Sequence, residues 1–513
     1  MSSSKDLKEL FAFSWNLSVV MRRKIFFRYF LNSWDLIFLG IFTFLTRFFN
    51  LSFPKRVVFD EAHFGLYATK YFSHQYYFDI HPPLGKMLLA LAGFFGKIKP
   101  GFNFEINSFY GDFNFLALRF LPALFGSLLV LLIYFFVKEM GFSRRVSFLS
   151  GFMILFDNAF LVQSRLILLD IILVFLIFLS LYLFILSRKF SPLSFKWYLC
   201  NIFLSLALGG AISIKWTGFG ALAIVWFFII FEDRLFSKPK KEILARLGLI
   251  FIAPFLIYFL IFAIHFYLLP LSCKADCGTV LEHYLHPDKY FLKSPTNALL
   301  YGNSPPGGNL LNKFLKANRL MLGSNLGTGT TFYYQSDWWS WPLMARPIQY
   351  FQESQNGKTS VIYFIGNPII WWLGIVGILG YFYLIIKNFL FKFRLKMPQI
   401  LYSGSLLILI SGYLAYMIPF STIPRFMLMY HYLPALLFSI IIFSILFEII
   451  IEMLFGPSPK EKFFFTSAKA NFLFIVLLII ILSGFLYFLP LTYGFPVTDG
   501  EYNARMWLDT WAL

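Results

Sequence analysis

Long apolar runs alternate with polar segments along this chain. A helix needs about 20 apolar residues, at 1.5 Å per residue, to cross the ~30 Å hydrocarbon core of a bilayer. Runs close to that length predict about eleven crossings, at 34–50, 115–138, 146–163, 167–187, 197–214, 217–231, 247–270, 361–386, 399–419, 426–453 and 471–490. The apolar segment 83–95 is too short to cross, so we expect it to lie at the membrane interface. The pattern predicts an all-α, polytopic membrane protein.

Basic residues in the short loops predict the orientation, because cytoplasmic loops are enriched in Lys and Arg. We take residues 1–34 as a cytoplasmic segment. Every predicted loop on that side is then basic, within 144–145, 188–196, 234–246, 387–396 and 460–469. The transmembrane domain, 35–490, accordingly presents two long loops to the outside, 51–114 and 271–360, followed by an outward tail, 491–513.

Composition argues against a water-soluble protein. Of 513 residues, 59% are hydrophobic and 13% are charged, with a mean hydropathy of +0.71, whereas soluble domains carry roughly 25% charged residues. The net charge of +19 fits basic loops beside anionic lipid, so we predict no nucleic-acid partner. Three cysteines make no disulfide framework. Cys273 and Cys277 share a loop and can pair if it faces an oxidising space.

The most polar stretch follows the first predicted crossing. It reads FDEAHFGLYATKYFSHQYYFDIHPPLGK, from Phe59 to Lys86, and holds the adjacent acids Asp60 and Glu61. Acids at a membrane boundary are costly to place and are functional candidates by default. The alternative is a solvated loop whose charges mark the end of a crossing. We favour a site, because two acids adjoin and a rigid His-Pro-Pro turn follows.

Isolated cations lie at the outward ends of the predicted crossings. They are Arg119, Arg165, Lys215 and Arg425. Each alone is equally well explained as a side chain reaching toward lipid head groups. Four on the side that is poor in basic residues, together with the acids, favour a shared anion site. Phosphate is the natural ligand of Arg and Lys, and a lipid-linked phosphate would lie at this depth.

The histidines of the polar stretch allow a second interpretation, as metal ligands beside the acids. They are His63, His74 and His81. The spacing Asp-Glu-x-His matches no recognised metal geometry, so we predict no metal site. His63 and His81 remain candidates for lining a substrate cavity, although His81 also leads a structural turn. His431 and Tyr432 either line the same cavity or form a buried pair.

Several motifs resemble protein O-mannosyltransferases. The segment 59–93 resembles the first outward loop of that family, and the similarity continues in LRFLPALFGS (118–127), QSRLILLD (163–170), SIKWTG (213–218) and MYHYLPAL (429–436). SWPLMARPIQYF (340–351) and GNPIIWW (366–372) resemble the bacterial branch. The second long loop is too short for the β-trefoil MIR domain that eukaryotic members insert there. The resemblance implies a GT-C-type glycosyltransferase without that domain.

Transfer of a sugar from a lipid phosphate to a hydroxyl needs a base and cations for the departing phosphate. Asp60 is best matched to the base, since a carboxylate with a pKa of about 4 is ionised at neutral pH. Glu61 supports the active site or forms a structural pair. The resemblance implies mannose transfer from a polyprenyl phosphate to Ser or Thr of proteins, by one inverting displacement. No cofactor is expected.

Two alternatives remain open. One is a GT-C enzyme that moves a sugar from a polyprenyl phosphate to a lipid or glycan. The other is a transporter or non-catalytic subunit, which would place charges within the crossings. For the favoured function the partners are the lipid-linked donor, the bilayer, and an acceptor protein met during secretion. We expect a bacterial cytoplasmic membrane, with the active site facing outward.

Overall fold

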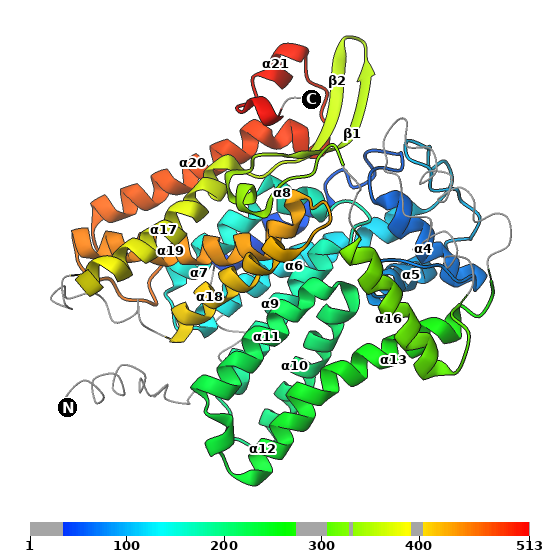
Figure 1. The fold of residues 1–513 in the computed structure, drawn as a ribbon. Coiled ribbons are helices and arrows are strands. Elements are labelled where there is room, and N and C mark those ends of the chain that lie inside the picture. The colour runs from blue at the N-terminus through cyan, green and yellow to red at the C-terminus, as the bar shows by residue number, and fades with distance from the viewer. Residues whose placement is uncertain (1–33, 273–304, 328–331, 391–403, 512–513) are drawn as a thin grey trace.

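The computed structural model describes residues 34–272, 305–327, 332–390 and 404–511. Helices dominate this part of the chain (Figure 1). In chain order they and the two strands are α3 (Trp34–Phe48), α4 (Glu61–Ser73), α5 (Leu84–Phe95), α6 (Phe115–Glu139), α7 (Arg144–Leu155), α8 (Asn158–Gln163), α9 (Asp170–Ser187), α10 (Phe195–Ile214), α11 (Phe219–Phe227), α12 (Lys240–Arg246), α13 (Ala253–Leu268), α16 (Leu310–Leu326), β1 (Ile348–Gln355), β2 (Lys358–Phe364), α17 (Pro368–Leu390), α18 (Gly404–Ala415), α19 (Leu433–Phe455), α20 (Ala468–Tyr493) and α21 (Asp499–Asn503). The predictions for residues 1–33 and for Cys273 and Cys277 lie outside the described residues.

Among the described residues, 8 helical segments are long and apolar enough to cross a membrane. They are Phe115–Glu139, Asp170–Ser187, Phe195–Ile214, Lys240–Leu268, Pro368–Lys387, Gly404–Thr422, Met429–Phe455 and Ala468–Tyr493. Each coincides with a crossing expected from the apolar runs, and α6, with 25 residues, reaches about 37 Å at 1.5 Å per residue. The other three expected crossings fall on the shorter helices α3, α7 with α8, and α11.

Two predicted boundaries differ from the structure. Residues 146–163 form two helices, because the buried Asp157 accepts a hydrogen bond from the backbone N–H of Phe160 and starts α8. The other oxygen of the same carboxylate accepts bonds from Asn367 N and Trp371 Nε1, both at 3.0 Å. Residues 361–364, predicted to open a crossing, belong to β2, whose VIYF run pairs with β1.

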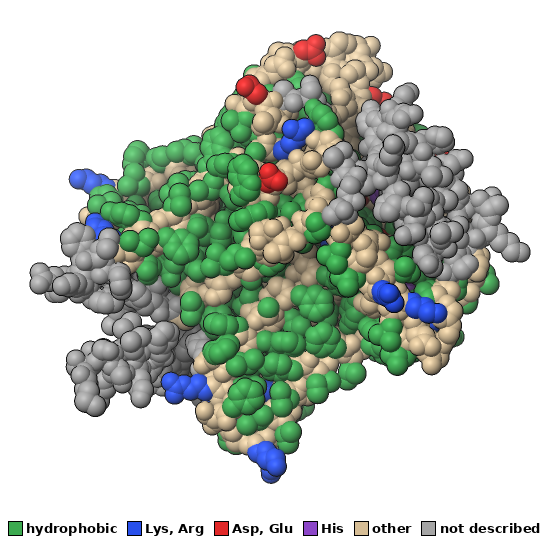
Figure 2. Space-filling view, in the orientation of Figure 1, with side chains coloured by type: hydrophobic (Ala, Val, Ile, Leu, Met, Phe, Trp, Pro, Cys, Tyr) green, Lys and Arg blue, Asp and Glu red, His purple; other side chains and the backbone are tan. Residues whose placement is uncertain are grey.

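The helices pack in two groups, one around α9 and the other around α19. Helix α9 lies against α6 and α10, and α19 lies against α17 and α18. The middle of α19 is almost wholly buried, whereas α13, α17 and α20 expose most of their apolar side chains. Hydrophobic side chains cover the broad middle of the face in Figure 2. This distribution matches a helical bundle whose outer helices face lipid.

The end predicted to face the cytoplasm is held by ion pairs between its basic loops and buried or half-buried acids. They are Arg144 with Asp35, Arg145 with Glu448, Lys189 with Glu139, and Arg188 and Arg246 with Asp233. The basic residues of these loops therefore connect neighbouring helices, in addition to indicating the cytoplasmic side of the membrane.

The two long loops fold together at the opposite end of the bundle. The first contains α4 and α5, and the second contains α16 and the hairpin β1–β2 (Figure 1). A backbone hydrogen bond of 2.8 Å from Tyr76 N to Leu271 O connects them. The hairpin in turn meets the C-terminal segment, where Thr359 pairs with Val497. Residues far apart in the sequence therefore meet above the helical bundle.

Candidate active site

Glu61, the second acid of the polar stretch, is fully buried at the first position of α4. Both carboxylate oxygens are saturated. The donors are Arg119 Nε at 2.8 Å, Arg119 Nη2 at 2.9 Å, Tyr110 Oη at 3.0 Å, Ile167 N at 3.0 Å and Val58 N at 3.2 Å. This carboxylate joins the first loop to α6 and to the α8–α9 turn, which favours the structural-pair interpretation of Glu61 over a catalytic one.

Arg119 is the partner of Glu61 and is itself fully buried. Its remaining N–H groups donate to the backbone carbonyls of Leu51, Pro54 and Arg56, at 3.2, 2.9 and 3.5 Å. A guanidinium has five N–H donors, and all of them have protein acceptors here. Arg119 therefore has no donor left for a lipid phosphate, and the geometry argues against the predicted phosphate role.

Arg165 is occupied in a similar way. Its guanidinium donates to the carbonyls that follow α3, those of Phe49 and Asn50, and lies over the ring of Tyr493 with 4.3 Å to the centroid. The side chain is 3% exposed. A cation at a helix C-terminus satisfies carbonyls that the helix leaves open. Both Nη groups of Arg165 thus have protein acceptors, and the shared phosphate ligand of the four cations stays a prediction.

Asp60 is the opposite of its neighbour. It is partly exposed and occupies the position before α4, and its carboxylate accepts no hydrogen bond from any described residue. The preceding residue, Phe59, has φ of 47°, a strained value that aromatic residues rarely adopt and that clusters at functional sites. Burial raises the pKa of Asp60 to about 7, opposed by Lys215 and assisted by Asp170 and Asp79. This value differs from the ordinary pKa near 4 expected from the sequence.

Lys215 lies close to Asp60, at the end of α10. Its ammonium group donates to both carboxylate oxygens of Asp170, at 2.8 and 2.9 Å. The rings of Phe64 and Tyr430 flank it, with centroids at 5.9 and 5.2 Å. An ammonium group has three N–H donors, and Asp170 occupies two of them. Lys215 is thus a fixed positive charge beside Asp60 with a donor to spare.

Arg425 is the predicted cation that remains unengaged. Its side chain is partly exposed, and its guanidinium forms no hydrogen bond or ion pair with a described residue. Burial lowers its pKa, while Tyr430 and Asp79 raise it. Arg425 and Lys215 both act on His81, whose pKa is held well below its usual range by burial and by these positive charges. Two positive charges therefore act on the His-Pro-Pro turn.

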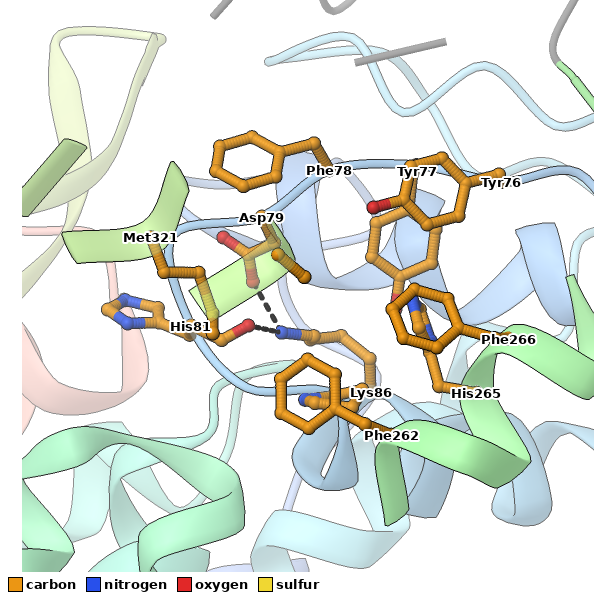
Figure 3. Close-up of a pocket in the computed structure, with 12 residues that line it drawn as sticks. Tyr76, Tyr77, Phe78, Asp79, His81, Lys86, Phe262, His265, Phe266 and Met321 are labelled. Carbon is orange, nitrogen blue, oxygen red and sulfur yellow. Dashed lines mark hydrogen bonds and ion pairs between the residues drawn. The ribbon is translucent and has the colours of Figure 1, made fainter. Parts of the chain in front are cut away.

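The His-Pro-Pro turn is fastened by Lys86. Its ammonium group donates to Asp79 Oδ2 at 2.5 Å and to the carbonyls of His81 and Pro82, both at 2.7 Å. Figure 3 shows the contacts of Lys86 with Asp79 and His81 at the wall of a pocket between the first loop and α13 and α16, with the His81 ring directed away from Lys86. Lys86 is fully buried, and its three N–H donors all bond to the turn or to Asp79. The lysine therefore holds the His-Pro-Pro turn in place.

The remaining predicted residues lie in different surroundings. His63, on α4, has its ring 6.3 Å from that of Tyr67. His431 donates from Nδ1–H to the carbonyl of Leu428 at 2.8 Å, and its ring stacks on Tyr430. Tyr432 is fully buried against Trp371, so it belongs to the core and not to a cavity. Within the described ranges, no group of three or more His, Cys, Asp or Glu could hold a metal ion.

Four residues of this region were not predicted as site residues. They are Asp79, Asp170, Tyr350 and Tyr430, and each influences or is influenced by the charge of Asp60. Asp170 ends the QSRLILLD motif and Tyr430 lies within MYHYLPAL, so both were inside motifs already singled out. Nothing in the local pattern marked Tyr350, because its position depends on how the hairpin docks.

Two family models match the chain and together cover most of it. Residues 37–270 match dolichyl-phosphate-mannose-protein mannosyltransferase, and residues 310–511 match the C-terminal four-transmembrane region of protein O-mannosyltransferase. The chain belongs to the protein O-mannosyltransferase family. The resemblance seen in the motifs is thereby confirmed.

Curated relatives match over part of this family member. Dolichyl-phosphate-mannose–protein mannosyltransferase 3 of Saccharomyces cerevisiae is 36% identical over 250 residues, which are 46% of this chain and 33% of that protein. Mannosyltransferase 1 of Candida albicans is 33% identical over 302 residues, 56% of this chain and 32% of that protein. The matched segment thus spans about a third of the length of these relatives.

Solved structures share the fold. The S. cerevisiae protein O-mannosyltransferase Pmt1–Pmt2 complex bound to the sugar donor matches with a TM-score of 0.79 at 20% identity, covering 99% of this chain and 94% of that chain. The oligosaccharyltransferase of Archaeoglobus fulgidus in the apo form matches with a TM-score of 0.52 at 15% identity, covering 94% of this chain and 58% of that chain. The predicted GT-C-type polytopic fold is therefore confirmed.

Proposed function

We propose that this protein O-mannosyltransferase family member transfers mannose from a polyprenyl-phosphate donor to Ser or Thr hydroxyls of proteins. The observation that carries the proposal is the arrangement around Asp60. An unpaired carboxylate with a raised pKa lies under the influence of the fixed charge of Lys215, and both Asp60 and the unengaged Arg425 act on Tyr430. This combination brings a base for a hydroxyl and cations for a phosphate into one region.

Arg425 and Lys215 are the proposed ligands of the donor phosphate. Arg425 can offer a planar fork of N–H groups to phosphate oxygens. Lys215 can offer the donor that Asp170 leaves unused. We do not propose this role for Arg119 or Arg165, since the donors of Arg119 are bonded to Glu61 and backbone carbonyls, and both Nη groups of Arg165 donate to backbone carbonyls.

The reaction is written as one displacement. The acceptor hydroxyl oxygen forms a bond to the anomeric carbon while the bond from that carbon to the phosphate oxygen breaks. The hydroxyl proton passes to Asp60, and the departing phosphate retains the electron pair beside Arg425 and Lys215. A base works best when its pKa lies near the working pH, so a value of about 7 suits Asp60 to accept this proton.

The acids around the site favour inversion. A retaining mechanism needs two working carboxylates, whereas a single displacement needs one. Glu61 is bonded to Arg119, Asp79 to Lys86, and Asp170 to Lys215. Asp60 is the carboxylate of this group without such a partner among the described residues.

We further propose that the site faces outward from a bacterial cytoplasmic membrane. The basic loops that contain Arg144 and Lys189 lie at the other end of the bundle, as expected for the cytoplasmic side. An outward site would meet acceptor proteins during secretion. The acceptor itself is the part of this proposal that needs direct measurement.

The test uses the purified chain in lipid nanodiscs with polyprenyl-phosphate mannose and a Ser/Thr peptide. Mass spectrometry should show one hexose added to the peptide, and a peptide with Ala at those positions should gain none. A parallel reaction offers a polyprenyl lipid or a glycan as acceptor. Hexose on the lipid or glycan, with none on the peptide, would contradict the proposed protein acceptor.

A further inference from the structure

The two edges of the hairpin β1–β2 differ in their backbone hydrogen bonds to other segments. The pairs Gln355 with Lys358 and Ser354 with Thr359 flank the two-residue turn Asn356-Gly357. Both turn residues have positive φ, 53° and 70°, as a type I′ turn requires. The residues that close such a turn form a hydrogen-bonded pair, and pairs then alternate along the ladder.

The alternation determines which peptide groups point out of the hairpin. On β2, Thr359 points outward, and its backbone bonds Val497 of the C-terminal segment in both directions, at 2.8 and 3.0 Å. One edge of the hairpin is thus already extended by another segment of the chain. The other edge, along β1, presents the backbone of Ser354 and Gln352, which hydrogen-bond to no described residue.

A β-bulge connects this open edge to the active site. Gln349 pairs with Tyr363 and Phe351 with Ile362, so Tyr350 is the extra residue without a partner on β2. Bulges redirect side chains and are frequent beside active sites. Here the ring of Tyr350 stacks on Phe59, with centroids 4.1 Å apart.

Phe59 immediately precedes Asp60, so the open edge of β1 ends at the proposed base. Two buried amide oxygens at this end lack hydrogen-bond partners among the described residues, namely Oε1 of Gln349 and Oε1 of Gln163. The amide nitrogens of the same side chains donate to Gln352 Oε1 and to Tyr350 Oη, at 2.7 and 2.9 Å. Buried acceptors normally have partners, so these two oxygens are open to a donor group that a ligand brings.

We propose that the open edge of β1 binds the acceptor polypeptide as an added strand and leads its hydroxyl past Tyr350 to Asp60. This inference rests on the proposed function, since it concerns the acceptor of the same site. Main-chain hydrogen bonds to Ser354 and Gln352 would give affinity with little demand on sequence. A strand rises about 3.3 Å per residue, so a segment of about six residues would span this edge.

The peptide experiment uses backbone N-methylation, which removes one N–H donor at a time. Acceptor peptides carrying a single N-methyl group at successive positions are assayed with the wild-type enzyme. Because every second residue of an added strand bonds to β1, KM should rise about three- to tenfold at alternate positions and stay unchanged between them. The value of kcat should change little at positions away from the reacting residue.

The protein experiment removes the matching donor from the enzyme. Proline is tolerated on edge strands where its missing N–H points outward, so Ser354→Pro should raise KM for the unmethylated peptide by a similar factor. Ser354→Ala is the matched comparison and should raise KM less than Ser354→Pro, because it keeps the backbone N–H. In Ser354→Pro, methylation of the peptide residue opposite should have a reduced additional effect.

The outcomes separate this inference from the proposed function. Mannosylation of the unmethylated peptide without any alternation in the scan would overturn the added strand and leave the proposed function intact. Equal KM values for Ser354→Pro and Ser354→Ala would also overturn it. If no peptide is mannosylated, both proposals are wrong. If Ser354→Pro does not fold, the scan with wild-type enzyme decides alone.

Discussion

Asp60 and Glu61 are neighbours in the chain, yet they belong to two regions with opposite chemistry. Glu61 is fully buried and accepts hydrogen bonds from Arg119, Tyr110 and two backbone N–H groups. Asp60 is partly exposed, has no donor among the described residues, and has a raised pKa. A saturated carboxylate is available only to hold structure. An unsaturated one keeps its lone pairs for a substrate.

The same difference separates the cations. Arg119 and Arg165 donate hydrogen bonds to backbone carbonyls. The guanidinium of Arg425 has no hydrogen-bond acceptor among the described residues, and Lys215 keeps one N–H donor free. Each region therefore contains carboxylates and cations. The two regions differ in whether these groups already form hydrogen bonds with the protein. The predictions below change one region at a time.

The largest effect is expected for Asp60→Asn. General-base catalysis contributes about 10²–10⁴-fold to rate, so transfer should fall by about that factor while the protein folds and inserts normally. The matched control is Asp112→Asn, an exposed carboxylate of the same loop, which should keep wild-type activity. Transfer is measured with purified protein and the peptide acceptor. Near wild-type turnover of Asp60→Asn would show that another group accepts the proton.

Glu61→Gln should act on stability first. It breaks a buried ion pair and leaves Arg119 uncompensated, which costs about 3–5 kcal/mol. Thermal unfolding in detergent should show a lower midpoint than for Glu105→Gln, an exposed acid of the same loop. Combining Glu61→Gln with Arg119→Met should cost less than the sum of the single changes. A Glu61→Gln variant that is fully stable and inactive would instead place Glu61 in the chemistry.

Arg425→Ala should weaken donor binding without affecting folding. Loss of a charge-assisted hydrogen bond costs about 1.5–3 kcal/mol, which is roughly tenfold to a hundredfold in affinity. Arg319→Ala, an exposed arginine of α16, is the control and should bind donor normally. Arg425→Lys should restore part of the loss, since the charge remains but the planar fork does not. Unchanged donor affinity in Arg425→Ala would remove Arg425 from the phosphate site.

The length of the apolar runs predicted the helices well, because crossing a bilayer requires a minimum number of apolar residues in every helix. All eight candidate spans had been expected at nearly their observed positions. The break at Asp157 was not predictable, since it depends on hydrogen bonds to Asn367 and Trp371, more than 200 residues away. Residues 361–364 looked like the start of a helix because an apolar strand next to a crossing has no distinguishing period.

The candidate site was predictable only in part, for a related reason. Arg119, Arg165 and Arg425 look alike in the sequence, as single cations at the ends of apolar runs. Their roles differ because loop carbonyls at Pro54 and Asn50 fold back onto the first two and not onto the third. The pKa of Asp60 likewise depends on burial by segments that approach from elsewhere in the chain.

If Asp60 takes the proton of the acceptor hydroxyl, transfer must depend on pH in a defined way. Burial raises the pKa of Asp60 to about 7, and only the ionised form is a base. The rate of single-turnover transfer should therefore fall tenfold per pH unit below that value and level off above it, over about pH 5 to 9. The small residual rate of Asp60→Asn should lack this dependence. A wild-type rate that stays flat through pH 7 would contradict the claim.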